Sequence, residues 1–382
     1  MNLLFPYLAR WRSANWSRYH QLLGRLCRQG HRVHVLEAPM WHGAAETNYT
    51  DAAVVPLPAG MAVHEIPVPL WRARLPLEKL AKKGLLTLAT RRYVAEMVRA
   101  FDIDVLLLYN FPQCILAPAA GGRCKVVFDV ADDLLSMFAT EAGRWRPLLY
   151  PIARRAFDSL VKRSDLVITC STTLAARLPG AACVVPNGAD LEAAAAADGR
   201  AIRGQYPTPI VGFVGAFEYV VDFDLVLDAA AMVPEATFLL VGTGRRWEEV
   251  RRQAGDRGLT NVVLPGPVPY PRNLDYVDAM DVCLLPRVPG PVADGAAPLK
   301  LFEYLALGKP VVATPMKEVE LIAGDLVTVA HNGAQAAARI REILDRPEAW
   351  RARVEAGRAR VQSTYNWDRI ARDLAALLVS GR

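Results

Sequence analysis

The sequence has no apolar run long enough to span a membrane. A membrane-spanning helix needs about 18 consecutive apolar residues, and no stretch of the 382 residues reaches that length. The chain starts MNLLFPYLARWRS, in which no basic residue precedes the short apolar run, whereas a secretory leader carries basic residues first. We therefore expect a cytoplasmic protein that begins with a strand.

The sequence also lacks the cysteine patterns of metal sites and the motifs of nucleic-acid-binding domains. Its six cysteines form no CxxC pair and no metal-ligand spacing, which favours reduced, mostly buried thiols and no bound metal. No helix-turn-helix, RRM or zinc-finger signature is present. Nucleic acid is therefore not expected as a partner.

The composition is that of a well-packed α/β protein with an uneven charge. Hydrophobic residues make up 52% and charged residues 22% of a chain that is too long for one ordinary core, which indicates two domains. Residues 1–190 contain 23 Lys and Arg against 15 Asp and Glu, a net charge of +8, and the remainder has 22 against 24, or −2. The basic half suits a membrane surface or a phosphate-bearing acceptor.

The most informative stretch covers residues 298–315, PLKLFEYLALGKPVVATP. Its apolar residues fall on one face of a helix that Gly308 ends, and a short apolar run, 311–313, follows as a buried parallel strand. The N–H groups of the first helical turn and Lys300 suit a phosphate, and Glu303, one turn later, could accept hydrogen bonds from a vicinal diol. The alternative is an ordinary solvent-exposed Lys–Glu pair.

The chain opens with the strand, loop, helix and strand pattern of a doubly wound α/β domain, in which ligands bind at the carboxyl ends of the strands. The loop after the first strand carries Arg12, Asn15 and Trp16, and a later buried strand ends at Asn110. We expect these four residues at the ligand cleft of this first domain. His20, early in the first helix, could act as a base or have a structural role.

An aspartate pair follows another buried strand, in the run DVADDLLSMF. Asp132 or Asp133 could serve as a general base for an acceptor hydroxyl, or could bind a sugar. The same run also reads as a helix with an aspartate N-cap. Both interpretations remain open at this point.

Residues 70–101 mix basic and apolar side chains and begin with a leucine and a tryptophan. This pattern is typical of a segment that contacts a membrane interface, and also of many ordinary surface helices. Peripheral contact with a membrane through this segment is one prediction of the sequence.

The stretch 298–315 resembles the nucleotide-sugar-binding segment of GT-B glycosyltransferases of group 1, especially bacterial enzymes that build polysaccharides, including the teichuronic acid type. Weaker support comes from PNGAD at 186–190, GFVG at 212–215 and a tail that carries Trp367. The resemblance implies two doubly wound, Rossmann-like domains that face a cleft.

The domain limits follow from the same motifs. We expect an acceptor-binding domain, a linker, a nucleotide-sugar-binding domain and a helix that crosses back to the first domain, at 1–190, 191–209, 210–364 and 365–382, respectively.

The resemblance also implies roles for individual residues. The family's ribose-binding Glu corresponds to Glu303, and the helix start that faces the donor diphosphate corresponds to Leu299 and Lys300. The Gly215 backbone and Arg287 are expected to contribute to the same diphosphate site.

Two departures from the family pattern stand out. Many members have Arg or Lys shortly after the glycine that Gly215 represents, where this chain has Ala216, Phe217 and Glu218. Retaining members often carry a second Glu eight positions before the ribose Glu, where this chain has Gly295. The donor-sugar contact and the retaining or inverting outcome are therefore open.

The function that the resemblance implies is a metal-independent hexosyltransferase without a cofactor. It would move a sugar from a nucleotide-diphosphate sugar to a glycan or polyprenyl-linked acceptor in bacterial surface polysaccharide synthesis, in the cytoplasm and peripherally on the inner face of the plasma membrane. The alternatives are a GT-B-type nucleotide-sugar epimerase and a non-catalytic nucleotide- or glycan-binding homologue. The nucleobase, the sugar and the acceptor are not specified.

Overall fold

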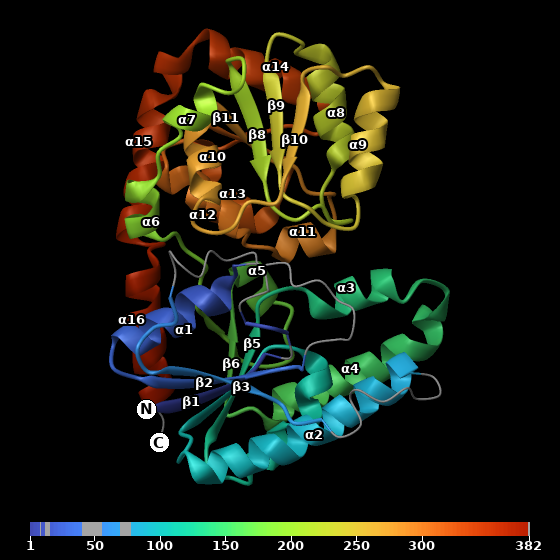
Figure 1. Ribbon diagram of the computed structural model, residues 1–382, viewed down its shortest axis with the longest axis vertical. Coiled ribbons are helices and arrows are strands. Elements are labelled where there is room, and N and C mark those ends of the chain that lie inside the picture. Colours follow the sequence, from blue (N-terminus) through green and yellow to red (C-terminus); the bar gives the residue numbers. More distant parts are fainter. Residues whose placement is uncertain (8, 12–15, 40–55, 69–77, 381–382) are drawn as a thin grey trace. The chain divides into compact units, whose positions relative to one another are not determined.

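The structure is a computed structural model that describes residues 1–7, 9–11, 16–39, 56–68 and 78–380, with the backbone alone for 78–84. The chain divides into two compact units, the first formed by Met1–Val185 with Ala371–Arg382 and the second by Pro186–Ile370. Each unit contains a parallel sheet between layers of helices (Figure 1). The predicted α/β class with two doubly wound domains is confirmed.

The first unit is built on a seven-stranded parallel sheet with the order β3-β2-β1-β4-β5-β6-β7 in the described part of the chain. Its strands are β1 (Asn2–Pro6), β2 (Arg32–Glu37), β3 (Met61–Glu65), β4 (Val105–Leu108), β5 (Lys125–Val130), β6 (Leu166–Thr169) and β7 (Cys183–Val184). The strand order reverses between β1 and β4. Ligands of doubly wound folds bind beside such a reversal, at the carboxyl ends of the strands.

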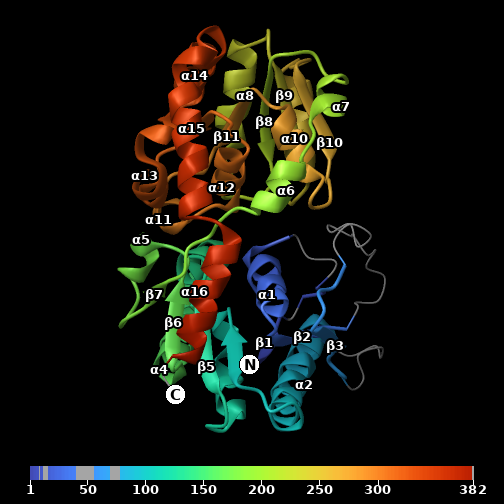
Figure 2. The same cartoon turned by 90° about the vertical axis from the view of Figure 1, so that its left-hand side faces the viewer.

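The helices of the first unit cover both faces of this sheet. They are α1 (Arg18–Arg28), α2 (Glu78–Ala100), α3 (Leu134–Glu141), α4 (Arg146–Arg163) and α5 (Thr172–Ala175), with 3₁₀ turns η1 (Phe111–Ile115), η2 (Ala117–Ala120) and η3 (Gly143–Trp145). Val94 of α2 and Phe157 of α4 belong to one buried apolar cluster with alternate residues of the strands. Helix α1 and the end of the C-terminal helix α16 (Trp367–Val379) run along the opposite face (Figure 2).

The second unit has a six-stranded parallel sheet with the order β10-β9-β8-β11-β12-β13. Its strands are β8 (Ile210–Val214), β9 (Thr237–Val241), β10 (Val262–Gly266), β11 (Val282–Leu285), β12 (Val311–Ala313) and β13 (Thr328–Val329). Its helices are α6 (Leu191–Ala196), α7 (Arg200–Arg203), α8 (Phe223–Met232), α9 (Trp247–Asp256), α10 (Asn273–Ala279), α11 (Pro291–Gly295), α12 (Leu299–Ala306), α13 (Lys317–Ala323), η4 (Gly324–Leu326), α14 (Gly333–Asp345) and α15 (Pro347–Ser363), followed by α16.

The two faces of this second sheet are packed differently. Apolar side chains of α8, α9 and α14 form one buried cluster with strand residues such as Phe213 and Phe238. On the other face, a Cβ at Gly212 would lie 2.2 Å from Cε of Met280, just after α10. The glycine therefore lets this connection lie directly against β8.

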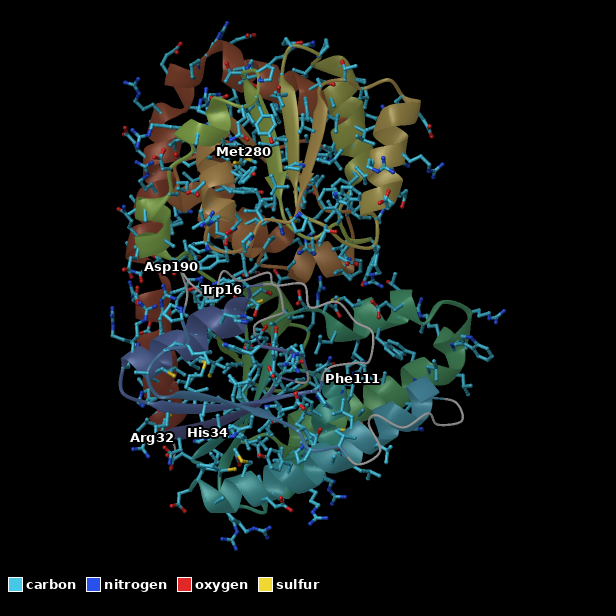
Figure 3. The ribbon with its side chains drawn as sticks, viewed as in Figure 1. Trp16, Arg32, His34, Phe111, Asp190 and Met280 are labelled. Atoms are coloured by element: carbon cyan, nitrogen blue, oxygen red, sulfur yellow. The ribbon has the colours of Figure 1, made fainter. Side chains whose placement is uncertain are left out.

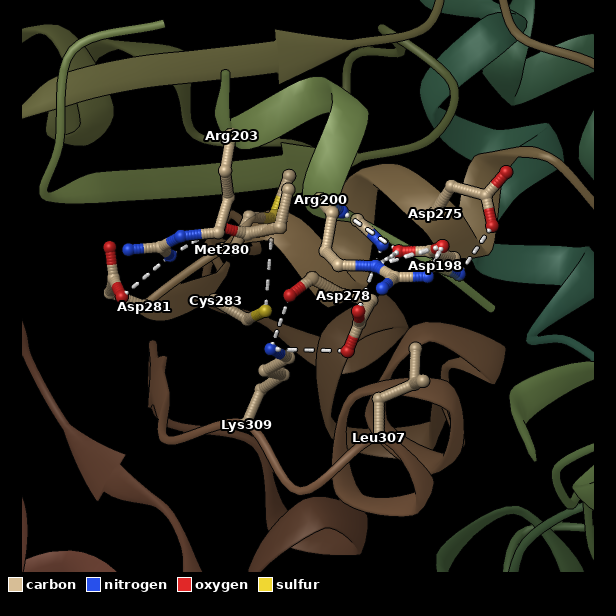
Figure 4. Close-up of polar contacts among 12 residues, drawn as sticks. Asp198, Arg200, Arg203, Asp275, Asp278, Met280, Asp281, Cys283, Leu307 and Lys309 are labelled. Carbon is tan, nitrogen blue, oxygen red and sulfur yellow. Dashed lines mark hydrogen bonds and ion pairs between the residues drawn. The ribbon is translucent and has the colours of Figure 1, made fainter. Parts of the chain in front are cut away.

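The segment 191–209, predicted to be a linker, instead contains α6 and α7 and belongs to the second unit. Figure 4 shows how it is held. The Gly199 N–H donates to the Asp278 carboxylate at 2.9 Å, and Arg203 binds the Asp281 carboxylate at 2.8 Å. The segment is rich in alanine, the best helix former, and these polar contacts fix it in place.

No helix in the described ranges is both long and apolar enough to cross a membrane.

Candidate functional site

The helix predicted from the 298–315 stretch is α12, and its position follows from its apolar face. Leu301, Phe302, Tyr304 and Leu305 are buried, so this side of the helix packs into the second unit. The Tyr304 hydroxyl accepts a hydrogen bond from the N–H of Val214, the last residue of β8, at 3.2 Å. The strand predicted to follow is β12, and both predicted elements are confirmed.

The two ends of α12 are formed as the sequence predicts. Pro298 is the N-cap residue and no side chain caps the first turn, which begins at Leu299. Gly308 lies just after the last turn with φ = 64°, a left-handed conformation that glycine adopts without strain. The N-cap residue thus provides no side-chain oxygen for the first N–H groups of α12, and a helix start of this kind attracts anions.

Lys300 lies directly against the loop that follows β8. A Cβ at Gly215 would be 2.0 Å from Lys300 Cε and 2.3 Å from its Nζ, so only glycine leaves room for this side chain. The ammonium also lies 5.3 Å from the centroid of the Phe213 ring, within the range of a cation–π contact. The structure therefore brings together two of the residues predicted to bind a donor.

Glu303 and Lys300 are partly exposed, and in the part of the chain that the structure describes neither side chain makes a hydrogen bond or an ion pair. Desolvation and the charge of Arg287 lower the pKa of Lys300 to about 8, while Glu303 raises it. Desolvation raises the pKa of Glu303, Lys300 opposes this rise, and the charge of Asp190 adds to it. Arg287, Lys300 and Glu303 therefore form one electrostatic cluster.

Arg287 is held at the end of β11 by its backbone. Its N–H donates to the Thr314 hydroxyl at 2.7 Å, and the same hydroxyl donates to the Arg287 carbonyl at 2.7 Å. Glu218, which replaces a basic residue of the family pattern, forms an ion pair with Arg245 at 2.6 Å. The cations of this cluster are therefore Arg287, after β11, and Lys300 of α12.

Sequence reasoning missed Asp190 and Tyr270 as parts of this cluster. The Tyr270 hydroxyl donates to Asp190 Oδ2 at 2.8 Å, and Asp190 is the carboxylate that acts on the pKa of Glu303. Asp190 also caps α6 by accepting from the Ala193 N–H at 3.2 Å (Figure 3). In the sequence, Asp190 is the final residue of the PNGAD motif. That motif by itself indicates only a segment between domains, not a binding residue.

The PNGAD run also fixes the start of α12. The side-chain amide of Asn187 donates to the Ala297 carbonyl at 2.7 Å, one residue before the N-cap. A Cβ at Gly188 would lie 2.5 Å from the Tyr365 carbonyl oxygen, because Ala189 forms a bridge with Asn366. Two motifs far apart in the sequence, PNGAD and the Trp367 tail, are therefore packed side by side within the second unit.

In the first unit, His20 has a structural position. Its ring is buried, its Nδ1 accepts from the Ser17 N–H at 3.2 Å, and its Nε2 lies 2.8 Å from the Trp11 carbonyl oxygen. Burial lowers its pKa to about 4. Both ring nitrogens are engaged within the protein, which favours the structural alternative for His20.

The aspartate pair is divided between two roles. Asp133 caps α3, accepting from the Ser136 N–H at 3.0 Å, and lies 3.3 Å from Arg177. The interpretation of this run as a helix with an aspartate N-cap therefore holds for Asp133. Asp132 is partly exposed next to it. Asp129, a third acid of the same run, lies within β5, is completely buried and pairs with Arg18 at 2.8 Å.

The predicted acceptor-side residues have different outcomes. Trp16 stacks on His20 with ring centroids 4.8 Å apart, at the N-terminal end of α1 (Figure 3). Asn110 is the N-cap residue of the 3₁₀ turn η1. Arg12 and Asn15 lie outside the described residues, as do 69–77, which include the start of the segment 70–101.

The chain is similar to known glycosyltransferases in sequence and in fold. The family model "Glycosyltransferase Family 4" matches residues 17–193, and the model "Glycosyl transferases group 1" matches residues 208–346. The chain is 30% identical over 223 residues to the "Putative teichuronic acid biosynthesis glycosyltransferase TuaH" of Bacillus subtilis, covering 54% of this chain and 55% of that protein. It is 27% identical over 274 residues to glycogen synthase of Mycobacterium tuberculosis, covering 65% of this chain and 63% of that protein.

The chain therefore matches between about half and two thirds of the length of these curated relatives. Among solved structures, sucrose-phosphate synthase from Thermosynechococcus elongatus has a TM-score of 0.76 at 18% identity, over 98% of this chain and 97% of that one. Anabaena Alr3699/HepE in complex with UDP and glucose has a TM-score of 0.75 at 17% identity, over all of both chains. With family models matched in both halves and the same fold throughout, the chain belongs to the GT-B glycosyltransferases.

Proposed function

We propose that this chain transfers a hexosyl group from a nucleotide-diphosphate sugar to a glycan or polyprenyl-linked acceptor in bacterial surface polysaccharide synthesis. The observation that carries the proposal is the pair Lys300 and Glu303, one turn apart at the start of α12, which lack hydrogen-bond partners among the described residues. Similarity to TuaH and to a structure that holds UDP and glucose supports it.

Each part of the donor would meet a different part of the cluster. The diphosphate would bind the first N–H groups of α12 at Leu299, the Gly215 backbone, and the cations of Lys300 and Arg287. The Glu303 carboxylate would accept hydrogen bonds from the two ribose hydroxyls. The cations would also stabilise the charge that develops on the departing nucleoside diphosphate, without requiring a metal ion.

The first unit would supply the acceptor side. Asp132 and Asp133 are the candidates for a general base, and Asp133 also caps α3. Trp16 and Asn110 remain candidates for acceptor contacts, and Arg12 and Asn15 remain predictions from the sequence. We also place the enzyme in the cytoplasm, at the inner face of the membrane where polyprenyl-linked acceptors lie.

The test is a thermal-shift screen against UDP, GDP, ADP, CMP and dTDP, followed by product assays with the matching nucleotide sugar. A ligand at 100 times its Kd stabilises the folded state by about 2.7 kcal/mol. Since charge-assisted hydrogen bonds contribute about 1.5 to 3 kcal/mol, Glu303→Ala should lower kcat/KM for the donor roughly 10- to 150-fold. Glu342→Gln, a change at an exposed site on α14, is the control.

Three results would contradict the proposal. One is the absence of a shift with any of the five nucleotides, and another is an unchanged kcat/KM in Glu303→Ala. The third is an altered donor sugar formed without any acceptor, which would indicate an epimerase.

A further inference from the structure

Helix α4 and the residue before it carry a row of large apolar side chains on the solvent side. The exposed fractions are 55% for Trp145, 64% for Leu148, 37% for Leu149 and 58% for Ile152. These four residues follow the i, i+3, i+4, i+7 spacing of one helix face. We call them the α4 apolar stripe; other exposed large apolar residues in the described ranges are scattered along the chain.

The stripe is separate from the buried face of α4. Helix α4 already buries a separate face, formed by Ala153, Phe157 and Leu160. A surface helix of a globular protein normally has one apolar face, directed at the core. A second apolar face directed at solvent indicates a surface that something else covers.

Basic residues surround the stripe and acidic ones are absent from it. Residues 142–157 contain four arginines and no Asp or Glu, and all four arginines are exposed: Arg144, Arg146, Arg154 and Arg155. Arg154 also forms an ion pair with Asp158, one turn further along α4, at 3.0 Å. The Arg144 guanidinium lies 5.2 Å from the centroid of the Trp145 ring. The Arg146 guanidinium lies 5.8 Å from the Tyr150 ring. Positive charge, aromatic rings and branched aliphatic side chains thus share one surface.

This combination matches the interface of an anionic bilayer. Trp and Tyr concentrate at the headgroup level, Leu and Ile enter the acyl boundary, and Arg binds lipid phosphates. A second copy of this chain would be a poor partner, since two copies of the same basic stripe would repel each other in a symmetric contact. The turn between α3 and α4 lies at the outer edge of the first unit, away from its sheet (Figure 1).

The segment 70–101 does not offer the same surface where the structure describes it. Leu86 of α2 packs against the buried cluster of the first unit, while Leu88 is 66% exposed. Residues 69–77 lie outside the described ranges. In the described part of this unit, the exposed large apolar residues outside α4 and Trp145 are Leu88, Phe101, Val184 and Val379, which do not form a row along one helix face.

We propose that the α4 apolar stripe docks the first unit onto an anionic membrane surface, with its flanking arginines on the phosphates of the lipid headgroups. This inference is independent of the proposed transferase activity, because binding to lipid requires neither donor nor acceptor. If both hold, the membrane surface would keep the enzyme near polyprenyl-linked acceptors.

The experiment is flotation of the full chain with vesicles of phosphatidylcholine alone or mixed with phosphatidylglycerol. We expect binding to the mixed vesicles, weakened by salt because headgroup attraction is screened. Leu148→Ser with Ile152→Ser should reduce the partition coefficient at least about tenfold, since two large apolar side chains no longer enter the bilayer. Leu321→Ser with Met232→Ser, which changes two exposed apolar residues of the second unit, should leave it unchanged.

Equal unfolding temperatures of the two double variants would show that both are folded. The proposal is overturned if the wild-type chain does not float with anionic vesicles, or if both double variants lose binding equally. It is also overturned if light scattering shows a dimer that only the stripe variant loses while vesicle binding persists, because the stripe would then be an interface between copies. A fourth contrary result is equal binding to neutral and anionic vesicles.

Discussion

Lys300 is a lysine whose charge changes near neutral pH. Desolvation and the nearby charge of Arg287 lower its pKa to about 8, so it is mostly protonated at pH 7 and mostly neutral at pH 9. A diphosphate is attracted only by the protonated form. The affinity of the free enzyme for its nucleoside diphosphate should therefore fall as pH rises through about 8.

This pH dependence can be measured by calorimetry between pH 7 and 9. We expect the affinity to fall by up to about tenfold, because the protonated fraction of a group with a pKa of about 8 falls about tenfold between pH 7 and 9. Lys300→Met should bind more weakly at pH 7 and show a flatter profile. Lys317→Met, at an exposed site on α13, should behave like wild type; a wild-type profile in Lys300→Met would exclude this role.

His20 makes folding stability depend on pH. Its folded-state pKa, about 4, lies below the usual 6.5 because the ring is buried. The Ser17 N–H can only donate, to Nδ1, and the Trp11 carbonyl can only accept, from Nε2. The neutral imidazole, with its proton on Nε2, therefore satisfies both contacts. Protonation favours the unfolded chain, so His20 contributes stability above pH 6.5 that is lost as pH falls toward 4.

The expected loss is about 3 kcal/mol of unfolding free energy between pH 6.5 and 4. Urea unfolding of wild type and His20→Gln at several pH values isolates the contribution of His20 to the free energy of unfolding, because the two proteins share all other titrating groups. The variant should lose less stability on acidification. Parallel curves for the two proteins would show that His20 does not carry the effect.

At the scale of elements, the contact between PNGAD and the C-terminal tail depends on a glycine. Gly188→Ala would place a Cβ 2.5 Å from the Tyr365 carbonyl oxygen, so one of the two segments must move. We expect a loss of about 1 to 3 kcal/mol in the free energy of unfolding, as for other overpacked sites. The shift of Asn187, and with it of the start of α12, should also weaken donor binding.

Gly255→Ala is the matched comparison. Gly255 lies in helix α9, and a Cβ added there would have no atom within 4 Å, so alanine should stabilise the protein by about 0.4 to 1 kcal/mol. Chemical unfolding of both variants tests the pair. Equal effects of the two substitutions would show that the bridge between Ala189 and Asn366 does not constrain the fold.

At the scale of the whole molecule, the chain returns to its first unit at the end. Residues 371–382 belong to that unit, and Ala371, Leu374 and Leu378 of α16 are buried. The Lys125 ammonium of β5 donates to the carbonyl oxygens of Leu377 and Ser380 at 3.2 and 3.1 Å. The last helix is therefore part of the first core, and a cation of that core caps its C-terminal end.

Leu374→Ala should destabilise the first unit by about 2 to 5 kcal/mol, the usual cost of a cavity at a buried leucine. Leu321→Ala, at a site 65% exposed, should change stability by less than about 0.5 kcal/mol. Hydrogen exchange of β5 reports the stability of the first unit directly. Unchanged exchange in β5 for Leu374→Ala would show that α16 is not required by that core.

Much of the architecture could be predicted from the sequence, because it depends on local patterns. The alternation of strands and helices, the α12–β12 unit and the role of Gly308 follow from hydrophobic periodicity and backbone conformation over a few residues. The linker prediction for 191–209 was wrong because it used local information. The contacts that hold this segment in the second unit, of Gly199 with α10 and of Arg203 with Asp281, join residues far apart in the sequence.

The fold class, the family and the individual identities of Lys300 and Glu303 can be read from the sequence alone. Which distant residues join them depends on the tertiary structure: Gly215 lies against Lys300, Arg287 lies within its electrostatic range, and Asp190 lies near Glu303. The burial of His20 at the start of a helix and the exposure of the α4 apolar stripe depend on it in the same way. These properties depend on which segments pack together. Hydrophobic periodicity along a chain predicts local secondary structure, but it does not predict such long-range contacts.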